Sequence, residues 1–387
     1  MFRRTMSHAA RGLDHDYAAA VMISAGAAVG LLWSGLAGAS YQRAFNAFPS
    51  AITGLGIGSW RDVIGSGLMT VFFYAVGLEV ARERHHGSLR DLRHALAPML
   101  AALAGMAGPA IALVAIGLAL RNRTLVHGWG IPMATDIAFT LAALAVAGSS
   151  LPRSLRTFLL TLAITDDVAS IVILAATGAT HVRLAGLAAT GGALVVIATV
   201  SRFHRSTPWR LLVLVALWWG LAYAGVEPPL AGVLAGLAVP YEAHRSIHLE
   251  SAVTRVSTAL VLPLFAAAYC GVAWSHLSGS ASLTIVAAVV VARLLGKTAG
   301  IALGVRGARR LGARFASDIT GEMLTAAGLL CAIGLTVPLL FAGTLYHPAG
   351  AVYGAFDLGL LVASVLAAVV GVVLLRSASR RNIEGAA

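Results

Sequence analysis

The sequence predicts an all-α membrane protein with twelve transmembrane helices, and three observations lead to this fold class. Of 387 residues, 58% are hydrophobic and only 11% are charged, which excludes a disordered chain and argues against a soluble enzyme. The hydrophobic residues gather in runs close to the roughly 20 residues that a helix needs to cross the hydrocarbon core. The basic residues lie between these runs, as topology signals do, and not as a patch for nucleic acid.

Twelve hydrophobic segments can be placed along the chain. They lie near residues 17–37, 63–81, 95–119, 125–147, 152–177, 184–201, 209–224, 227–240, 256–273, 283–303, 322–345 and 355–375. The seventh and eighth are short, and Gly225, Pro228 and Pro229 separate them because these residues do not continue a helix comfortably. We therefore expect a single integral membrane domain over residues 1–387.

The arginines predict the orientation of the chain. There are 27 arginines and one lysine, Lys297, which lies inside a hydrophobic segment. Positively charged loops stay in the cytoplasm. With both termini inside, 21 arginines fall in cytoplasmic segments and five in outer loops. The outer five are Arg43, Arg61, Arg121, Arg123 and Arg183. This bias favours an even number of spans with both termini cytoplasmic.

Four ionisable residues lie well inside the predicted spans: Asp136, Asp166, Asp167 and Lys297. Each costs several kcal/mol at bilayer depth, so each is a functional candidate. Any one of them alone is also compatible with a structural ion pair. Four such groups near mid-span instead predict a site for ions or protons.

The types of these side chains indicate the chemistry. Asp166 and Asp167 point about 100° apart on a helix, so they cannot both face one partner. Carboxylate oxygens suit a hard cation such as Na⁺ and equally bind a proton, but not both at once. Lys297 can release a proton when buried, whereas an arginine stays charged. The alternative is that Lys297 only neutralises helix C-terminal dipoles, and the two roles are compatible.

Two of the segments carry signals of interruption. Asp136 follows Pro132 and Thr135 in the fourth segment, where a carboxylate can compensate the positive end of a half-helix. For Asp136 this electrostatic role is favoured over transport. Gly334 and Pro338 mark a second interruption in the eleventh segment. Broken helices in both halves suggest an inverted-repeat core over about 95–177 and 283–375.

Seven stretches carry a resemblance that covers most of the chain in order. They are LMTVFFYAVGLEVARE (68–83), GWGIPMATDIAFTLA (128–142), LAITDDVASIVILA (162–175), LAGVLAGLAVP (230–240), LPLFAAAYCGV (262–272), GKTAGI (296–301) and LLCAIGLTV (329–337). On these stretches the sequence resembles the NhaA-type bacterial Na⁺/H⁺ antiporters.

The resemblance implies a function and a set of site residues. It implies a secondary active exporter of Na⁺ and Li⁺ in exchange for H⁺, electrogenic and regulated by pH, in the bacterial inner membrane. Such a transporter is not an enzyme and needs no cofactor. Asp167 would be the main site for Na⁺ and protons, with Asp166 beside it, and Lys297 would pair with Asp166 in the empty state. Asp136 and Thr135 would compensate helix dipoles where the discontinuous fourth and eleventh helices cross.

The resemblance also implies a pH-responsive region formed by Glu79, Arg82, Glu83 and Glu250. As plain chemistry the first three form an ordinary surface ion cluster at i, i+3 and i+4. These two interpretations stay open.

Some positions depart from the family pattern. Ser66 replaces a carboxylate and Glu227 replaces a histidine, while Ser251 and Thr254 replace histidines near Glu250. Arg293, one turn before Lys297, is an unusual extra cation that should favour the deprotonated lysine if the two are close. The first outer loop, about residues 38–62, is shorter than in the best-known members, which leaves a homodimer as an open alternative.

Two other classes of protein compete with an antiporter. An intramembrane aspartyl protease also uses membrane carboxylates, but it needs them on different helices, usually with a Gly-x-Gly-Asp element that this sequence lacks. A cation channel or a sodium-coupled solute symporter shares carboxylates and broken helices. Transport that requires a co-substrate, or that passes far more ions than a carrier cycle allows, would identify one of these.

Overall fold

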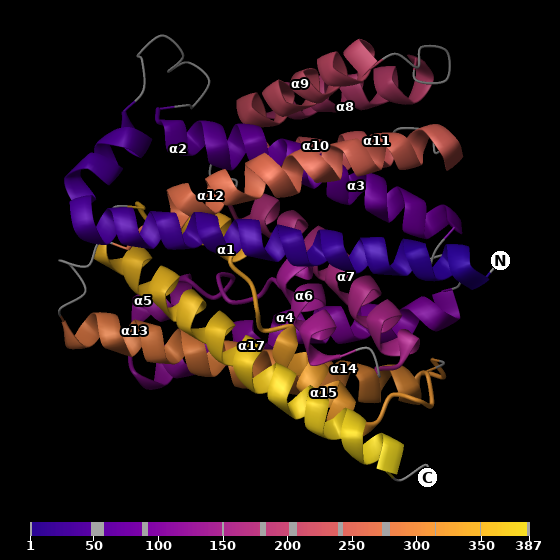
Figure 1. Cartoon of the computed structure of the whole chain (residues 1–387). Coiled ribbons are helices and arrows are strands. Elements are labelled where there is room, and N and C mark those ends of the chain that lie inside the picture. The colour runs from indigo at the N-terminus through magenta and orange to yellow at the C-terminus, as the bar shows by residue number, and fades with distance from the viewer. Residues whose placement is uncertain are drawn as a thin grey trace. The chain divides into compact units, whose positions relative to one another are not determined.

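The computed structural model is built from helices in the part of the chain that it describes. That part comprises residues 2–47, 58–86, 92–148, 151–178, 183–200, 207–238, 243–272, 279–313, 315–348 and 350–384. The α-helices are α1 (Phe2–Asn46), α2 (Trp60–Asp62), α3 (Met69–His86), α4 (Leu92–Ala119), α5 (Arg123–His127), α6 (Ile137–Ala147), α7 (Arg153–Gly178), α8 (Leu184–Val200), α9 (Thr207–Ala224), α10 (Leu230–Ala238), α11 (Ala243–Val256), α12 (Leu262–Tyr269), α13 (Ser280–Val291), α14 (Lys297–Arg310), α15 (Gly321–Leu330), α16 (Thr336–Leu345) and α17 (Ala351–Glu384). The π-helical segments are η2 (Val63–Leu68), η4 (Ser257–Val261) and η6 (Ala292–Gly296). Figure 1 shows their arrangement.

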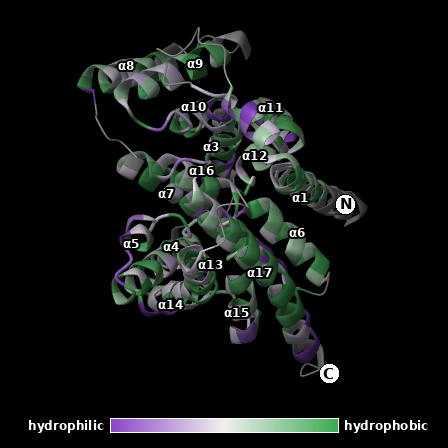
Figure 2. Cartoon of the chain, turned by 90° about the vertical axis from the view of Figure 1, so that its left-hand side faces the viewer, coloured by the Kyte–Doolittle hydropathy of each residue, from purple (hydrophilic) through white to green (hydrophobic). Residues whose placement is uncertain are grey.

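Seven stretches of helix among the described residues are long and apolar enough to cross a membrane. They are Ala18–Asn46, Trp60–His85, Ala95–Ala119, Arg153–Thr177, His248–Tyr269, Ser280–Arg310 and Ala351–Arg381. Shorter apolar helices lie at Ile137–Ala147, Leu184–Val196, Leu211–Ala224 and Thr336–Leu345. Figure 2 shows that hydrophobic residues dominate most helices, while hydrophilic ones gather at places such as α5 and the C-terminal end of α17. The described residues form helices and no strands, as predicted, and their apolar stretches are compatible with a membrane protein. The number of twelve spans and the crossing of two discontinuous helices stay predictions.

The chain divides into two compact units. The first comprises Met1–Ser24, Asp91–Ser170 and Val272–Ala387, and the second comprises Ala25–Arg90 and Ile171–Gly271. The first unit contains α4 to α6, most of α7, and α13 to α17. Within it α17 packs along α13 and α15 (Figure 1).

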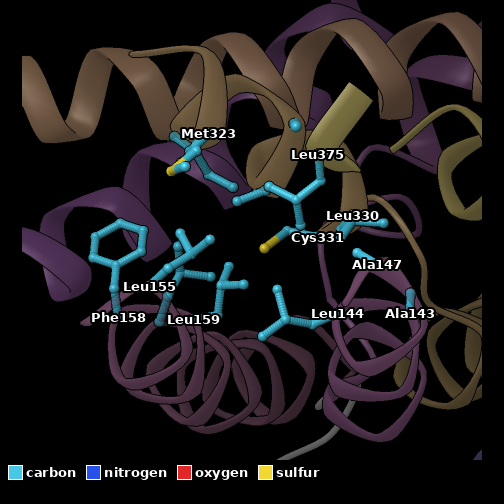
Figure 3. Packing of buried hydrophobic residues seen from close by; sticks show 14 of the residues in the cluster. Ala143, Leu144, Ala147, Leu155, Phe158, Leu159, Met323, Leu330, Cys331 and Leu375 are labelled. Carbon is cyan, nitrogen blue, oxygen red and sulfur yellow. The ribbon is translucent and has the colours of Figure 1, made fainter. Parts of the chain in front are cut away.

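The core of the first unit is apolar and closely packed. Figure 3 shows Cys331 among leucines that include Leu155, Leu159 and Leu330, with Met323 nearby. These residues come from α7, α15 and the segment after α15, so the core holds the interrupted helix against its neighbours. Both cysteines of the chain, Cys270 and Cys331, are buried, and neither is in a disulfide, as expected for packing residues.

The second unit buries a separate apolar cluster between α3, α9 and α10. Leu217 and Ala231 are fully buried in it, and Tyr74 of α3 packs on the same cluster. Glycines let α3 and α10 approach closely, since a Cβ at Gly77 would lie 2.7 Å from the carbonyl oxygen of Val233.

The structure differs from the expectation for the first outer loop. The backbone of α1 is not helical at Ala37, where the helix is kinked, and residues 38–46 form a helical stretch after the kink. Trp60–Asp62 form α2, while residues 48–57 lie outside the described part. Tyr41 anchors the stretch after the kink, because its hydroxyl donates to the carbonyls of Ala267 (3.0 Å) and Ala268 (2.7 Å).

Arg61, expected in that same loop as a topology signal, is instead buried. Its Nε donates to the carbonyl of Ala268 at 3.0 Å, and its Nη1 donates to Oδ1 of Asn46 at 2.7 Å. Ala268 belongs to the last turn of α12, where carbonyls carry partial negative charge, so a guanidinium is stabilised there.

Candidate functional site

Two helix interruptions lie at the centre of the first unit. The first break is residues 128–136 between α5 and α6, and the second break is residues 331–335 between α15 and α16. The backbone N–H of Asp136 donates to the carbonyl of Ile333 at 2.9 Å, which joins the two breaks directly. The hydroxyl of Thr135 donates to the carbonyl of Cys331 at 2.8 Å. Backbone groups freed from helical bonding in one break are therefore satisfied by the other.

Asp136 connects the start of α6 to the start of α16. Its backbone is extended, and it occupies the N-cap position of α6. Its Oδ2 accepts from the backbone N–H groups of Leu335 (2.8 Å) and Thr336 (3.1 Å), and its Oδ1 accepts from the hydroxyl of Thr336 (2.9 Å). A buried carboxylate is thus paired with the positive N-terminal end of a half-helix, where negative charge is stabilised.

Asp166 and Lys297 form an ion pair with no exposed surface. The Nζ of Lys297 lies 2.9 Å from Oδ1 and 3.1 Å from Oδ2 of Asp166, and it also donates to the carbonyl of Met133. The backbone N–H of Thr135 donates to Oδ2 of Asp166 at 2.5 Å. Each charge is therefore compensated by its partner and by the first break, as a buried ion pair requires.

Asp167 follows Asp166 on α7 and is 3% exposed. Its backbone carbonyl accepts from the hydroxyl of Ser170 at 2.9 Å. One helical step turns its side chain away from the face that carries Asp166. The structure thus gathers Asp136, Thr135, Asp166 and Lys297 around the first break, with Asp167 adjacent on α7.

Two further charged residues, Arg293 and Asp357, are buried in the first unit. Arg293 is fully buried in η6, and it donates from Nε to the carbonyl of Ala332 at 2.6 Å and from Nη2 to that of Ala134 at 2.5 Å. Asp357 is also fully buried. The sequence analysis did not single out Asp357, although it lies inside the predicted segment 355–375, and α17 begins at Ala351. A charged residue within an apolar segment was the signal that would have found it.

The four residues of the expected pH-responsive region come together around Arg82 in the second unit. Its Nη1 lies 3.2 Å from Oε1 of Glu250, while its Nη2 lies 3.6 Å from Glu79 and 3.4 Å from Glu83. Glu250 is on α11 and the other three are on α3, so the cluster joins two helices. Glu83 is buried and the side chain of Glu250 is only 12% exposed, so the cluster is partly buried. An exposed ion pair is worth about 0–1 kcal/mol, and a network can be worth more.

The chain is similar to bacterial antiporters over nearly its full length. The family model described as "Na+/H+ antiporter 1" matches residues 10–375. A relative from Acidovorax sp. named Na(+)/H(+) antiporter NhaA is 37% identical over 93% of this chain and 89% of its own. One of the same name from Cronobacter sakazakii is 36% identical over 95% of this chain and 97% of its own. A third, Na(+)/H(+) antiporter NhaA 2 from Novosphingobium aromaticivorans, is 38% identical over 82% of each chain. Because both the family model and relatives above 30% identity cover most of its length, the chain belongs to the Na+/H+ antiporter 1 family.

Proposed function

We propose that this chain is a secondary antiporter that exports Na⁺, and also Li⁺, in exchange for protons across the bacterial inner membrane. The observation that carries the proposal is the buried pair of Asp166 and Lys297, which lies against the first break with Asp167 beside it. An ion pair without exposed surface costs desolvation energy, so stability alone is a weak reason to keep one. The names of the relatives support Na⁺ and H⁺ as the exchanged ions.

Competition for carboxylate oxygens would couple the two ions. In the structure the ammonium group of Lys297 lies within hydrogen-bond distance of both oxygens of Asp166. Na⁺ bound by Asp166 and Asp167 would displace the ammonium group, which then gives its proton to water on the side to which the site is open. On the opposite side the carboxylates release Na⁺ and the lysine regains a proton. If more than one proton is exchanged for each Na⁺, the cycle moves net charge and is electrogenic.

The two breaks support an inverted-repeat core. In about 95–177 a short interrupted helix (α5 and α6) lies between the long helices α4 and α7. In about 283–375 another (α15 and α16) lies between α14 and α17. We propose that these two segments are the repeats, that the broken helices cross at mid-membrane, and that all spans together number twelve with both termini cytoplasmic. Alternating access would then be a motion around a site held by the breaks.

Regulation by pH would reside in the cluster around Arg82. It joins α3 to α11 through Glu250, so a change in the charge of its glutamates would alter the contact between these helices. The alternative is that it remains an ordinary surface ion network.

Replacement of Asp167 by asparagine tests the proposed function. We expect Asp167→Asn to abolish the dequenching of a pH-gradient dye by Na⁺ or Li⁺ in everted vesicles, because the amide lacks the charge that holds the cation. Asp318→Asn is the matched control, since Asp318 is exposed and accepts a hydrogen bond from Ser154. Unchanged exchange by Asp167→Asn, or equal loss in both variants, would contradict the assignment. K⁺ added in place of Na⁺ should give no response.

A further inference from the structure

Arg293 connects the two breaks through two different nitrogen atoms. Its Nε donates to Ala332 in the second break at 2.6 Å, and its Nη2 donates to Ala134 in the first break at 2.5 Å. The side chain has no exposed surface. Ala332 lies just after the C-terminal end of α15, where carbonyl oxygens carry partial negative charge. A planar guanidinium presents donors in a fixed fork, so one side chain can satisfy both carbonyls.

Gly334 makes room for this guanidinium group. A Cβ at position 334 would collide with Nη2 of Arg293 and would lie 2.6 Å from the carbonyl oxygen of Ala134. Within the described residues, Nη1 of Arg293 is buried without a hydrogen-bond partner. The group is thus placed to contact the two backbone segments, and no carboxylate hydrogen-bonds to it in this part of the chain.

The charged groups around the breaks hydrogen-bond to different backbone groups. Asp136 accepts from N–H groups of the second break and of α16, whereas Arg293 donates to carbonyls of both breaks. Lys297 donates to Asp166 and to the carbonyl of Met133. Arginine keeps its proton at any physiological pH, but a buried lysine can lose its proton. The charge on Arg293 is therefore permanent while that on Lys297 is free to change.

We propose that Arg293 is a positioning residue whose fixed positive charge joins the two breaks and keeps them charge-balanced while Lys297 exchanges its proton. This role rests on the proposed antiport function. Under this proposal Arg293 compensates the partial negative charge of the carbonyls in the two breaks. Lys297 then serves to neutralise Asp166 and to exchange a proton, and it is not required to hold the breaks together.

Two substitutions separate the hydrogen bonds of Arg293 from its charge. Arg293→Lys keeps the charge, but its one nitrogen replaces two nitrogens that lie apart, so it cannot keep both bonds at their present geometry. Arg293→Gln keeps a donor and loses the charge. We expect each to lower the Tm of the purified full chain in cation-free detergent by about 5 °C or more, because buried carbonyls lose donors. Arg306→Gln, an exposed position of α14, is the matched control and should melt like the wild type. A wild-type Tm for both Arg293 variants would overturn the proposal.

The kinetics of Na⁺ exchange in proteoliposomes test whether the positive charge of Arg293 affects Na⁺ binding. The positive charge of Arg293 repels Na⁺ and the ammonium group of Lys297 alike, so the two effects offset each other where Na⁺ displaces that ammonium. KM is therefore measured as a function of pH. At a pH high enough for Lys297 to be deprotonated before Na⁺ binds, we expect Arg293→Gln to lower the KM for Na⁺ by about threefold or more. Arg293→Lys should keep the wild-type KM even where its maximal rate falls. A purely structural role would change the rate or the amount of folded protein in both variants and leave KM unchanged. An unchanged KM in Arg293→Gln at that high pH would overturn the electrostatic part of the proposal.

A third variant covers the case in which Arg293→Gln does not fold. The double variant Asp166→Asn/Lys297→Met removes the ion pair as a neutral unit and leaves Arg293 in place. We expect it to lose exchange and to melt above Arg293→Lys, because only the carbonyl of Met133 loses its donor while Arg293 still satisfies those of Ala134 and Ala332. A Tm as low as that of Arg293→Lys would overturn the proposal. If the wild type itself exchanges no Na⁺, the proposed function fails, while the melting experiments still decide whether Arg293 joins the breaks.

Discussion

At the scale of single residues, the lone lysine and the arginine one turn before it have different partners. Lys297 pairs with a carboxylate, and Arg293 pairs with backbone carbonyls. The difference follows from their chemistry. A compact ammonium on a flexible stem can give up a proton and move, whereas a planar guanidinium suits two fixed acceptors. Residue type predicted which of the two can exchange a proton, but not what either one contacts.

Glu227 is a second residue whose environment determines its charge. It lies between α9 and α10, outside the apolar helices, and burial raises its pKa from 4.5 to about 7. The folded state therefore holds the proton more tightly than the unfolded state. Stability from this group is fully present below pH 4.5, falls as the pH rises toward 7, and stays lost above it.

Replacement of Glu227 by glutamine should remove this pH dependence. We expect Glu227→Gln to raise the Tm by about 5 °C at pH 8.5, on the order of 2 kcal/mol, and to change it little at pH 4.5. The physical reason is that the amide carries no charge to desolvate. Melting curves of both proteins at the two pH values provide the measurement. An equal Tm difference at both pH values would show that ionisation of Glu227 is not the cause.

At the scale of elements, the contact between α4 and α14 depends on glycines spaced four residues apart. Gly296, Gly300 and Gly304 lie on one face of the helical run through η6 and α14, and each approaches the backbone of α4. Small residues at this spacing let two helix backbones pack closely in a membrane. This contact positions Lys297, which lies between the first two glycines, against the first break.

A methyl group on this face should separate the two helices. In Gly300→Ala the new Cβ would lie 2.9 Å from the carbonyl carbon of Ala104. We expect the Tm to fall by about 5 °C, since overpacking costs roughly 1–3 kcal/mol. Gly307→Ala, on the same helix with open space around it, should raise the Tm by a degree or more because alanine favours helix by about 0.5–1 kcal/mol. A similar change in both variants would indicate that helix propensity, and not the contact with α4, controls the result.

At the scale of the whole molecule, the arginines predict orientation. The predicted cytoplasmic segments hold 21 arginines and the outer loops hold five. One of the outer five, Arg61, is buried and bonded to α12, so it is a structural residue and not a free topology signal. When Arg61 is not counted as a topology signal, the excess of arginines in the predicted cytoplasmic segments over the outer loops is larger.

Reporter fusions test this orientation. Green fluorescent protein fused after Ala387 should fluoresce in intact cells, because it folds only in the cytoplasm. Alkaline phosphatase fused after Asn122, in the predicted outer loop, should be active, and the same enzyme fused after Ala387 should be inactive. Active phosphatase at the C-terminus would contradict a cytoplasmic end and the even number of spans.

The sequence alone determined where the helices form and which residues are costly to bury. The length of a hydrophobic run and the positions of helix-breaking glycines and prolines are local properties of the sequence. For this reason α4, α7 and the interruption before α6 were predicted close to where they occur. The carboxylates and Lys297 could be identified because charge within an apolar run is rare. Arg61 was misjudged because a helix can begin before its apolar run, and local hydropathy does not report this. Asp357 was not singled out, although it lies inside a predicted segment.

Only the tertiary structure decided which of these residues meet. Asp166 and Lys297 are 131 positions apart, and Asp136 reaches backbone N–H groups about 200 positions away. Such contacts depend on how α4, α7 and α14 pack around the two breaks, and that packing follows from many small contacts that no local pattern encodes. The partners of Arg293 are backbone carbonyls, which carry no sequence signal at all, and they become available only because two helices are interrupted side by side.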